Sequence, residues 1–149
     1  MKVVKYYFNE LMENVSAFGS IFTHILLMAA AFALKDALLY PLLKGFALIY
    51  LIGVPVKLLV FKNRPKKMKY KDFWEKFEAS SFPSVHAARA VFLALVLCSR
   101  FNNNVLSILL FIVAALVMYS RIHLKKHYWT DVIGGLLVGV VIYYVSLMI

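Results

Sequence analysis

The chain has 149 residues, of which 63% are hydrophobic, and its mean hydropathy is +0.80, so an ordinary soluble globular domain is excluded. Its length is that of one domain, covering residues 1–149. The net charge is +10 and the basic residues are concentrated between apolar runs, which suits anionic headgroups or an anionic substrate and argues against a nucleic-acid partner.

The N-terminal part of the chain predicts a surface helix followed by a membrane span. In residues 2–15, apolar side chains recur at helical spacing opposite lysines and glutamates, which is typical of an amphipathic helix lying on a membrane. Residues 16–34 are apolar and long enough to cross a bilayer. The acidic residues and the length of chain before this run argue against a cleaved signal peptide.

Four more apolar runs predict spans, at residues 42–61, 84–98, 105–119 and 132–149. Pro55 is expected to kink the first of these helices, which neighbouring membrane helices can accommodate. Gly135 and Gly139 in the last run have the spacing that lets a second helix approach closely. The expected fold class is all-α: a polytopic membrane helical bundle of about five spanning helices, with one interfacial amphipathic helix at the N-terminus and one in a loop.

The loop helix is expected in the long connection formed by residues 62–82. Four aromatic residues there fall at helical spacing, with lysines and acidic residues elsewhere on the wheel: Tyr70, Phe73, Trp74 and Phe77. One interpretation places the rings at headgroup depth and the lysines toward water. The other is a solvated loop helix that packs on the bundle, and the pattern does not separate the two.

Polar segments at the ends of membrane helices are candidates for function, because charge is costly beside hydrocarbon. Lys57 and Arg64 have a spacing that returns to the same helix face, and Pro65 is expected to end that helix at Arg64. Ser84 is a candidate N-cap, and the free N–H groups of the turn after it form a potential anion site. His86 in that turn can protonate a departing oxygen. A snorkelling lysine and a simply capped helix are the plain alternatives.

The densest polar segment runs from Ser120 to Asp131. Asp131 follows His127 by four residues, so a helical conformation would bring its carboxylate to one ring nitrogen and leave the other nucleophilic. Arg121 supplies a planar guanidinium that matches the oxygens of a phosphate group. The hypothesis is that this segment meets the other two around a phosphate ester.

Two other interpretations of the same segment stay open. His123, His127 and Asp131 fall on one face of a helix, as metal ligands would. The segment can also be a basic membrane-proximal loop in a non-catalytic protein that binds anionic lipids. Lys125 and Lys126 are assigned to such a loop.

The three segments occur in the order Lys57-x6-Arg64-Pro65, Pro83-Ser84-x-His86 and Ser120-Arg121-x5-His127-x3-Asp131. This order resembles the three-part signature of the membrane type 2 phosphatidic acid phosphatases, the lipid-phosphate phosphatase superfamily. Its bacterial members include undecaprenyl-diphosphate phosphatases and phosphatidylglycerophosphate phosphatases. The resemblance covers residues 57–131, with Val85 where the family often has glycine and five predicted spans where six are common.

The resemblance implies a phosphatase that works through a phosphohistidine, with no metal or other cofactor. The implied catalytic residues are a nucleophile, a carboxylate that orients it and a proton donor: His127, Asp131 and His86. The implied phosphate-binding residues are Lys57, Arg64, Ser84 and Arg121. Because the polar segments lie at one end of the spans, the expected partner is an anionic lipid-phosphate substrate among the membrane lipids: a polyprenyl diphosphate, phosphatidate or phosphatidylglycerophosphate.

The expected location is the cell membrane, which the chain crosses several times. Five spans put the N-terminus and all three polar segments on one face, and that face carries most of the lysines. The positive-inside rule then places the site in the cytoplasm. Many members of the family that the chain resembles work on the outer face, and lysines that serve an anionic substrate are not clean evidence of topology. The side of the site stays open.

Overall fold

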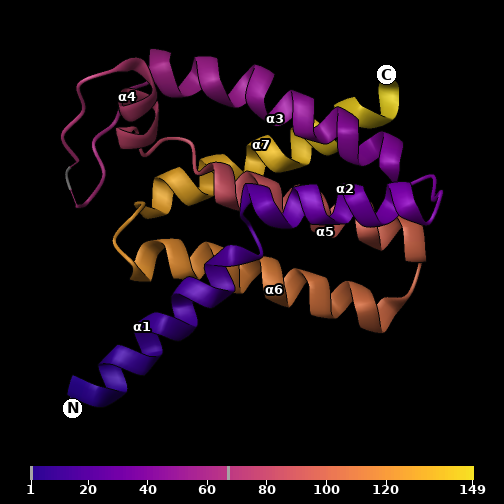
Figure 1. Cartoon of the computed structure of the whole chain (residues 1–149), viewed down its shortest axis with the longest axis horizontal. Helices are drawn as coiled ribbons and strands as arrows, with labels where there is room; N and C mark the ends of the chain where they lie inside the picture. The colour runs from indigo at the N-terminus through magenta and orange to yellow at the C-terminus, as the bar shows by residue number, and fades with distance from the viewer. Residues whose placement is uncertain (1, 67) are drawn as a thin grey trace.

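The computed structural model describes residues 2–66 and 68–149, and this part of the chain is a bundle of helices (Figure 1). Its seven helices are α1 (Lys2–Ala17), α2 (Ile21–Ala33), α3 (Leu39–Leu59), α4 (Phe73–Ala79), α5 (Val85–Phe101), α6 (Asn104–His123) and α7 (Trp129–Met148). Within the described residues the one β-type pairing is an isolated bridge between Asn63 and Ser80. The predicted all-α class is confirmed.

Three helices, α3, α6 and α7, are long and apolar enough to cross a membrane. The predicted span over residues 16–34 is divided, because Ser20 caps a new helix and α1 and α2 meet at a bend of 44°. Taken as one broken span, this pair is a fourth candidate. α5 has 17 residues and α2 has 13, so both are shorter than the three long helices.

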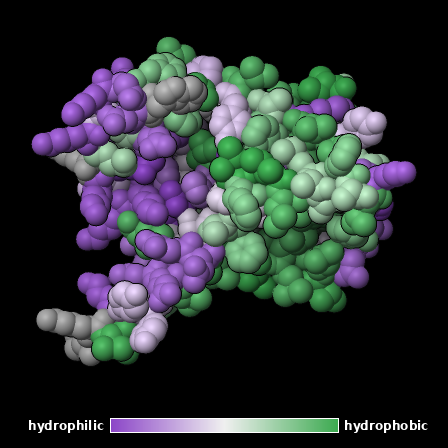
Figure 2. Space-filling model, in the orientation of Figure 1, coloured by the Kyte–Doolittle hydropathy of each residue, from purple (hydrophilic) through white to green (hydrophobic). Residues whose placement is uncertain are grey.

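The outer surface of the bundle is apolar over much of its area, as expected for a protein that lies in lipid. Large hydrophobic side chains are exposed along the helices, among them Phe22 at 71%, Leu51 at 70% and Leu59 at 83%. Figure 2 shows hydrophobic residues over most of the visible face and hydrophilic residues gathered at the end that holds α4 and the loops around it. A continuous apolar surface of this extent needs lipid as its solvent.

The most buried helix is α5, which packs against α3, α6 and α7. The contact with α7 depends on two glycines, since a Cβ atom at Gly135 would collide with the carbonyl oxygen of Ser84 and one at Gly139 with that of Ala88. The predicted close approach at these glycines is therefore confirmed. It fixes the first turn of α5 directly against α7.

The connection between α3 and α5 is shaped by early termination of α3. The helix ends at Leu59, with Pro55 inside it, so the predicted end at Arg64 is wrong and Lys57 and Arg64 do not share a helix face. The short helix α4 begins at its N-cap Asp72 and packs against α3. This contact favours the interpretation of a loop helix packed on the bundle. The predicted position of the Trp74 ring lies outside the described part of the structure.

Candidate active site

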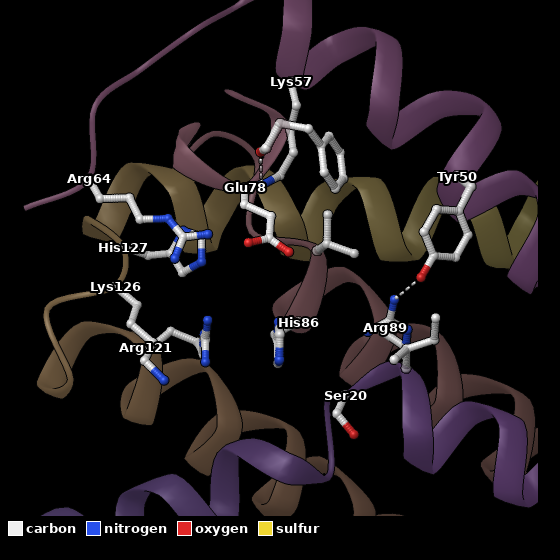
Figure 3. A pocket seen from close by; sticks show the side chains of 13 residues that line it. Ser20, Tyr50, Lys57, Arg64, Glu78, His86, Arg89, Arg121, Lys126 and His127 are labelled. Atoms are coloured by element: carbon white, nitrogen blue, oxygen red, sulfur yellow. Dashed lines mark hydrogen bonds between the residues drawn. The ribbon is translucent and has the colours of Figure 1, made fainter. Parts of the chain in front are cut away.

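A cavity of about 380 Å³ opens at the polar end of the bundle (Figure 3). Its walls come from the break between α1 and α2, from α3, α4, α5 and α6, and from the loops next to them. Five of the predicted site residues line it: Lys57, Arg64, His86, Arg121 and His127. The two predicted histidines therefore face one cavity, although they are far apart in the sequence.

His127 lies in a turn between two helices. α6 ends at His123, Lys125 adopts a left-handed conformation with φ of 54°, and the amide of His127 donates to the carbonyl oxygen of Arg121 at 3.1 Å. Its Nδ1 atom lies 2.7 Å from the carbonyl oxygen of Ser81. Because a carbonyl can only accept, Nδ1 carries the proton and Nε2 keeps its lone pair. His127 is thus held in the tautomer that a nucleophile needs.

The predicted hydrogen bond from the His127 ring to the Asp131 carboxylate is not formed. α7 begins at Trp129, so the four-residue spacing does not lie on one helix. The buried carboxylate of Asp131 accepts from the amide of Tyr128 at 2.8 Å and from Nζ of Lys62 at 2.7 Å. Asp131 therefore caps α7 and holds the loop that contains Lys62, while the Ser81 carbonyl takes the orienting position beside His127.

Ser84 is the N-cap of α5, as the sequence predicted, and its hydroxyl accepts from the amide of Ala87 at 3.4 Å. The side chain is fully buried and does not line the cavity. The amide of Ser84 donates to the carbonyl oxygen of Asp131 at 2.9 Å, which joins the start of α5 to α7. Ser84 and Asp131 thus support the cavity from behind its wall.

Lys57 contributes to the wall and to the fold at once. Its buried ammonium donates to the carbonyl oxygens of Ser80, at 2.8 Å, and Phe77, at 3.4 Å, at the end of α4. The same group lies 4.8 Å from the centre of the Phe77 ring. Lys57 therefore fastens α4 to α3 while its charge faces the cavity.

Three guanidinium groups in the cavity wall have unsatisfied donors. In the described part of the chain, the buried side-chain N and O atoms without a hydrogen-bond partner are Nδ1 of His24 and Nε of Arg64, Arg89 and Arg121. All three arginines line the cavity. A buried donor without a partner is costly, and a buried cation more so. A cavity wall with three arginine side chains has the charge that an anionic ligand needs, so this cavity is a candidate anion-binding site.

The same cations act on His127. Burial, followed by the positive charges of Arg121, Arg64 and Lys57, lowers the pKa of His127 well below its ordinary value of 6.5. The imidazole is therefore neutral near pH 7. Burial also lowers the pKa of Lys126, with Arg121 as the next cause. A positively charged wall can bind an anion, and a neutral imidazole within that wall can attack it.

Sequence reasoning missed five polar residues of the wall, namely Ser20, Tyr50, Glu78, Arg89 and Lys126. Lys126 was assigned to a plain basic loop; it lies in that loop, and its side chain also lines the cavity. Arg89 had a signal of its own, because it is a charge inside an apolar run, three residues after His86. Glu78 is the one acidic side chain among the described residues that line the cavity.

The metal interpretation is not supported by the arrangement of His123. Its Nε2 atom lies 2.9 Å from Oδ1 of Asn9 on α1, and its ring packs against Phe8 and Tyr119. It is therefore engaged with α1 and does not join His127 and Asp131. Across residues 2–66 and 68–149, no three His, Cys, Asp or Glu side chains are grouped to hold a metal ion.

The fold and the cavity define a class: helical membrane proteins with a cationic, histidine-containing cavity where several helices end. Residues 37–149 match the family model of the PAP2 superfamily. The chain therefore belongs to the PAP2 superfamily.

Three relatives extend this comparison. LpxE from Aquifex aeolicus is 25% identical, with a TM-score of 0.80 over 96% of this chain and 87% of LpxE. A transmembrane PAP2-type phosphatidylglycerolphosphate phosphatase from Bacillus subtilis is 23% identical, with a TM-score of 0.73 over 95% and 76% of the two chains, and shares the fold. A lipid A 4′-phosphatase from Porphyromonas gingivalis is 38% identical over 61 residues, which are 41% of this chain and 26% of that relative. The chain thus matches about a quarter of that relative's length.

Proposed function

We propose that this protein is a membrane phosphatase that removes a phosphate group from a lipid phosphate through a phosphohistidine, without a metal ion. The observation that carries the proposal is the meeting, in one cavity, of His127 with three arginines whose Nε donors lack partners. Phosphoryl transfer needs in-line positioning and positive charge around the equatorial oxygens. Four basic side chains of the wall can supply that charge: Lys57, Arg64, Arg121 and Lys126.

In the proposed reaction, Nε2 of His127 attacks phosphorus while the leaving oxygen takes the electron pair of the breaking P–O bond. The negative charge of the bound phosphate favours protonation of His86, which gives that oxygen its proton, since both histidines line the cavity. The Ser81 carbonyl keeps the proton of His127 on Nδ1 throughout. A water molecule then attacks the phosphohistidine, His86 accepts its proton, and inorganic phosphate leaves. Asp131 and Ser84 do not contact the substrate in this reaction, because neither lines the cavity; they hold the cavity wall in place.

A lipid substrate is supported by the surroundings of the cavity. The polar cavity lies at one end of an apolar bundle, at headgroup depth if the bundle spans a bilayer. A second, apolar cavity of about 310 Å³ is lined by α2, α5 and α6. Ser20 and Ile21 line the first cavity, and Phe18 and Thr23 line the second. A substrate can therefore keep its phosphate in one cavity and lay its tail toward the other.

The proposed substrates are a polyprenyl diphosphate, phosphatidate or phosphatidylglycerophosphate, and the proposed location is the cell membrane. Two relatives are named for phosphatases of lipid A and of phosphatidylglycerolphosphate, which supports a phosphorylated lipid. We propose that residues 1–149 form one domain. The packing of α1 against α6 and of α2 against α3 supports this.

The test is phosphate release from these lipids by the purified chain in detergent, with and without a chelator. The native chain is expected to release phosphate at the same rate in both conditions, and His127→Ala to release essentially none. Lys71→Ala, a loop variant outside the cavity wall, is the matched control and should behave as the native chain. Activity only on water-soluble esters would argue against a lipid substrate, and full activity of His127→Ala against the proposed nucleophile.

A further inference from the structure

Arg89 is a buried cation whose function the reaction above leaves open. It lies on α5, about one turn after His86, and its side chain is 3% exposed. Nη1 donates to the carbonyl oxygen of Gly19 at 2.8 Å, and Nη2 donates to the hydroxyl oxygen of Tyr50 at 3.2 Å. Nε has no partner, although Arg89 is part of the cavity wall.

The charge of Arg89 has no countercharge in the described part of the chain. The ion pairs found there are Lys62–Asp131 and Arg100–Asp36. Glu78 acts electrostatically on Lys57 and Arg64. A buried charge is normally paired, so a guanidinium that has hydrogen bonds but no countercharge in a cavity wall can serve as a binding group for an anionic ligand.

The position of Arg89 separates it from the other cations. In Figure 3, His86 lies between two groups of side chains, with Arg64, Arg121, Lys126 and His127 on one side. Arg89 and Tyr50 are on the other side, with Ser20 nearby. If His127 attacks phosphorus and His86 protonates the departing oxygen, then the leaving group lies beyond His86, toward Arg89.

We propose that Arg89, with the Tyr50 and Ser20 hydroxyls, forms a second anion subsite for a phosphate group on the leaving part of the substrate. This inference rests on the proposed phosphatase function and narrows its substrate class to lipids whose leaving group is itself a phosphate, foremost lipid diphosphates. The Tyr50 oxygen accepts from Arg89, so its own proton is free to be donated to the anion.

The charges of the cavity wall favour a lipid diphosphate over a lipid monophosphate. The wall carries five basic side chains and one carboxylate. A lipid monophosphate brings about two negative charges and a lipid diphosphate about three, so the diphosphate compensates the excess more completely. Charge-assisted hydrogen bonds from a guanidinium to phosphate oxygens are the strong kind.

With a lipid diphosphate as the substrate, the proposed reaction has two steps. Nε2 of His127 forms a bond to the terminal phosphorus, and the P–O bond to the bridging oxygen breaks. The bridging oxygen keeps the electron pair, takes the proton from His86 and leaves as part of the lipid monophosphate, whose negative charge Arg89 stabilises. Water then hydrolyses the phosphohistidine to inorganic phosphate, and the proton lost by the water passes to His86.

The experiment compares two probes with the same tail, farnesyl diphosphate and farnesyl monophosphate, on the full chain in detergent. For each variant the measured quantity is the ratio of kcat/KM on the diphosphate to kcat/KM on the monophosphate. Arg89→Gln is expected to lower this ratio by about tenfold to a hundredfold, the usual effect of removing a hydrogen bond to a charged group. Arg89→Lys should restore part of it, and Tyr50→Phe should lower it by less.

The matched control is Arg100→Gln, which removes an arginine charge at the far end of α5, where Arg100 pairs with Asp36. Its ratio should equal that of the native chain. If Arg89→Gln and Arg89→Lys lower activity on both probes equally, Arg89 only ties α5 to Gly19 and Tyr50, and the subsite proposal is wrong. If the native chain releases phosphate from neither probe nor from the lipid panel, it is the phosphatase function itself that fails.

Discussion

Replacing Asp131 with asparagine separates two roles for this residue. In the structure its buried carboxylate pairs with Lys62 at 2.7 Å and accepts from the amide of Tyr128, with no bond to His127. Removing one partner of a buried ion pair costs about 3–5 kcal/mol. The Lys62 side chain is 38% exposed, so solvent screens this ion pair. The expected loss in the free energy of unfolding is therefore that of a hydrogen bond to a charged group, about 1.5–3 kcal/mol.

Unfolding in a titration with sodium dodecyl sulfate, followed by tryptophan fluorescence, measures this loss. Asp131→Asn and Lys62→Met should each destabilise the protein, and the double variant should lose less than the sum, because both remove one interaction. Phosphate release should fall by about a hundredfold, the effect of moving a reacting group by roughly an ångström.

A direct bond between Asp131 and His127 in the working enzyme would give a different pattern. Loss of a carboxylate that fixes the tautomer of a catalytic histidine costs about 10⁴-fold in rate. A loss of that size in Asp131→Asn, with Lys62→Met nearly as active as the native chain, would refute the assignment of the orienting role to the Ser81 carbonyl.

Three further predictions concern the cavity and its support. Glu78→Gln should strengthen inhibition by inorganic phosphate several-fold, because it removes the one carboxylate of the described wall; unchanged inhibition would contradict this. Gly135→Ala should lower the free energy of unfolding by about 1–3 kcal/mol, as its Cβ collides with the Ser84 carbonyl, whereas Gly53→Ala, which meets only Val85 at 3.9 Å, is the control. In ¹⁵N NMR of histidine-labelled protein, His127 should stay neutral as the pH falls through 6.5, since its pKa is lowered, and titration near 6.5 would refute the electrostatic argument.

Much of the fold was predictable because hydrophobic runs and glycine spacing are local in the sequence. The bundle and the close approach at Gly135 and Gly139 followed from them. The ends of helices were less predictable, since Arg64 and His127 lie in loops whose course depends on tertiary hydrogen bonds. The amide of Lys66 donates to the carbonyl of Lys125, and Ser81 accepts from His127, and no local pattern reports either contact.

The cavity residues that could be predicted are those that belong to sequence motifs with a fixed spacing. Arg121 and His86 were found through their neighbours in sequence. Arg89 was overlooked because its apolar neighbours made its segment look like an ordinary span, although a lone charge there is a signal in itself. Glu78 and Tyr50 reach the cavity only through the packing of α4 and α3, which single-residue patterns do not encode.

The bend between α1 and α2 has a consequence for any shortened version of the chain. Nη1 of Arg121 donates to the Ser16 hydroxyl at 2.7 Å, and Arg89 donates to the Gly19 carbonyl, so two of the arginines are braced by residues that precede the family match at residue 37. A protein trimmed to the matched region would retain every motif residue yet leave both guanidinium groups without their braces. The N-terminal segment is thereby part of the support of the proposed anion site, and replacing it with an unrelated membrane anchor is expected to weaken the binding of phosphate.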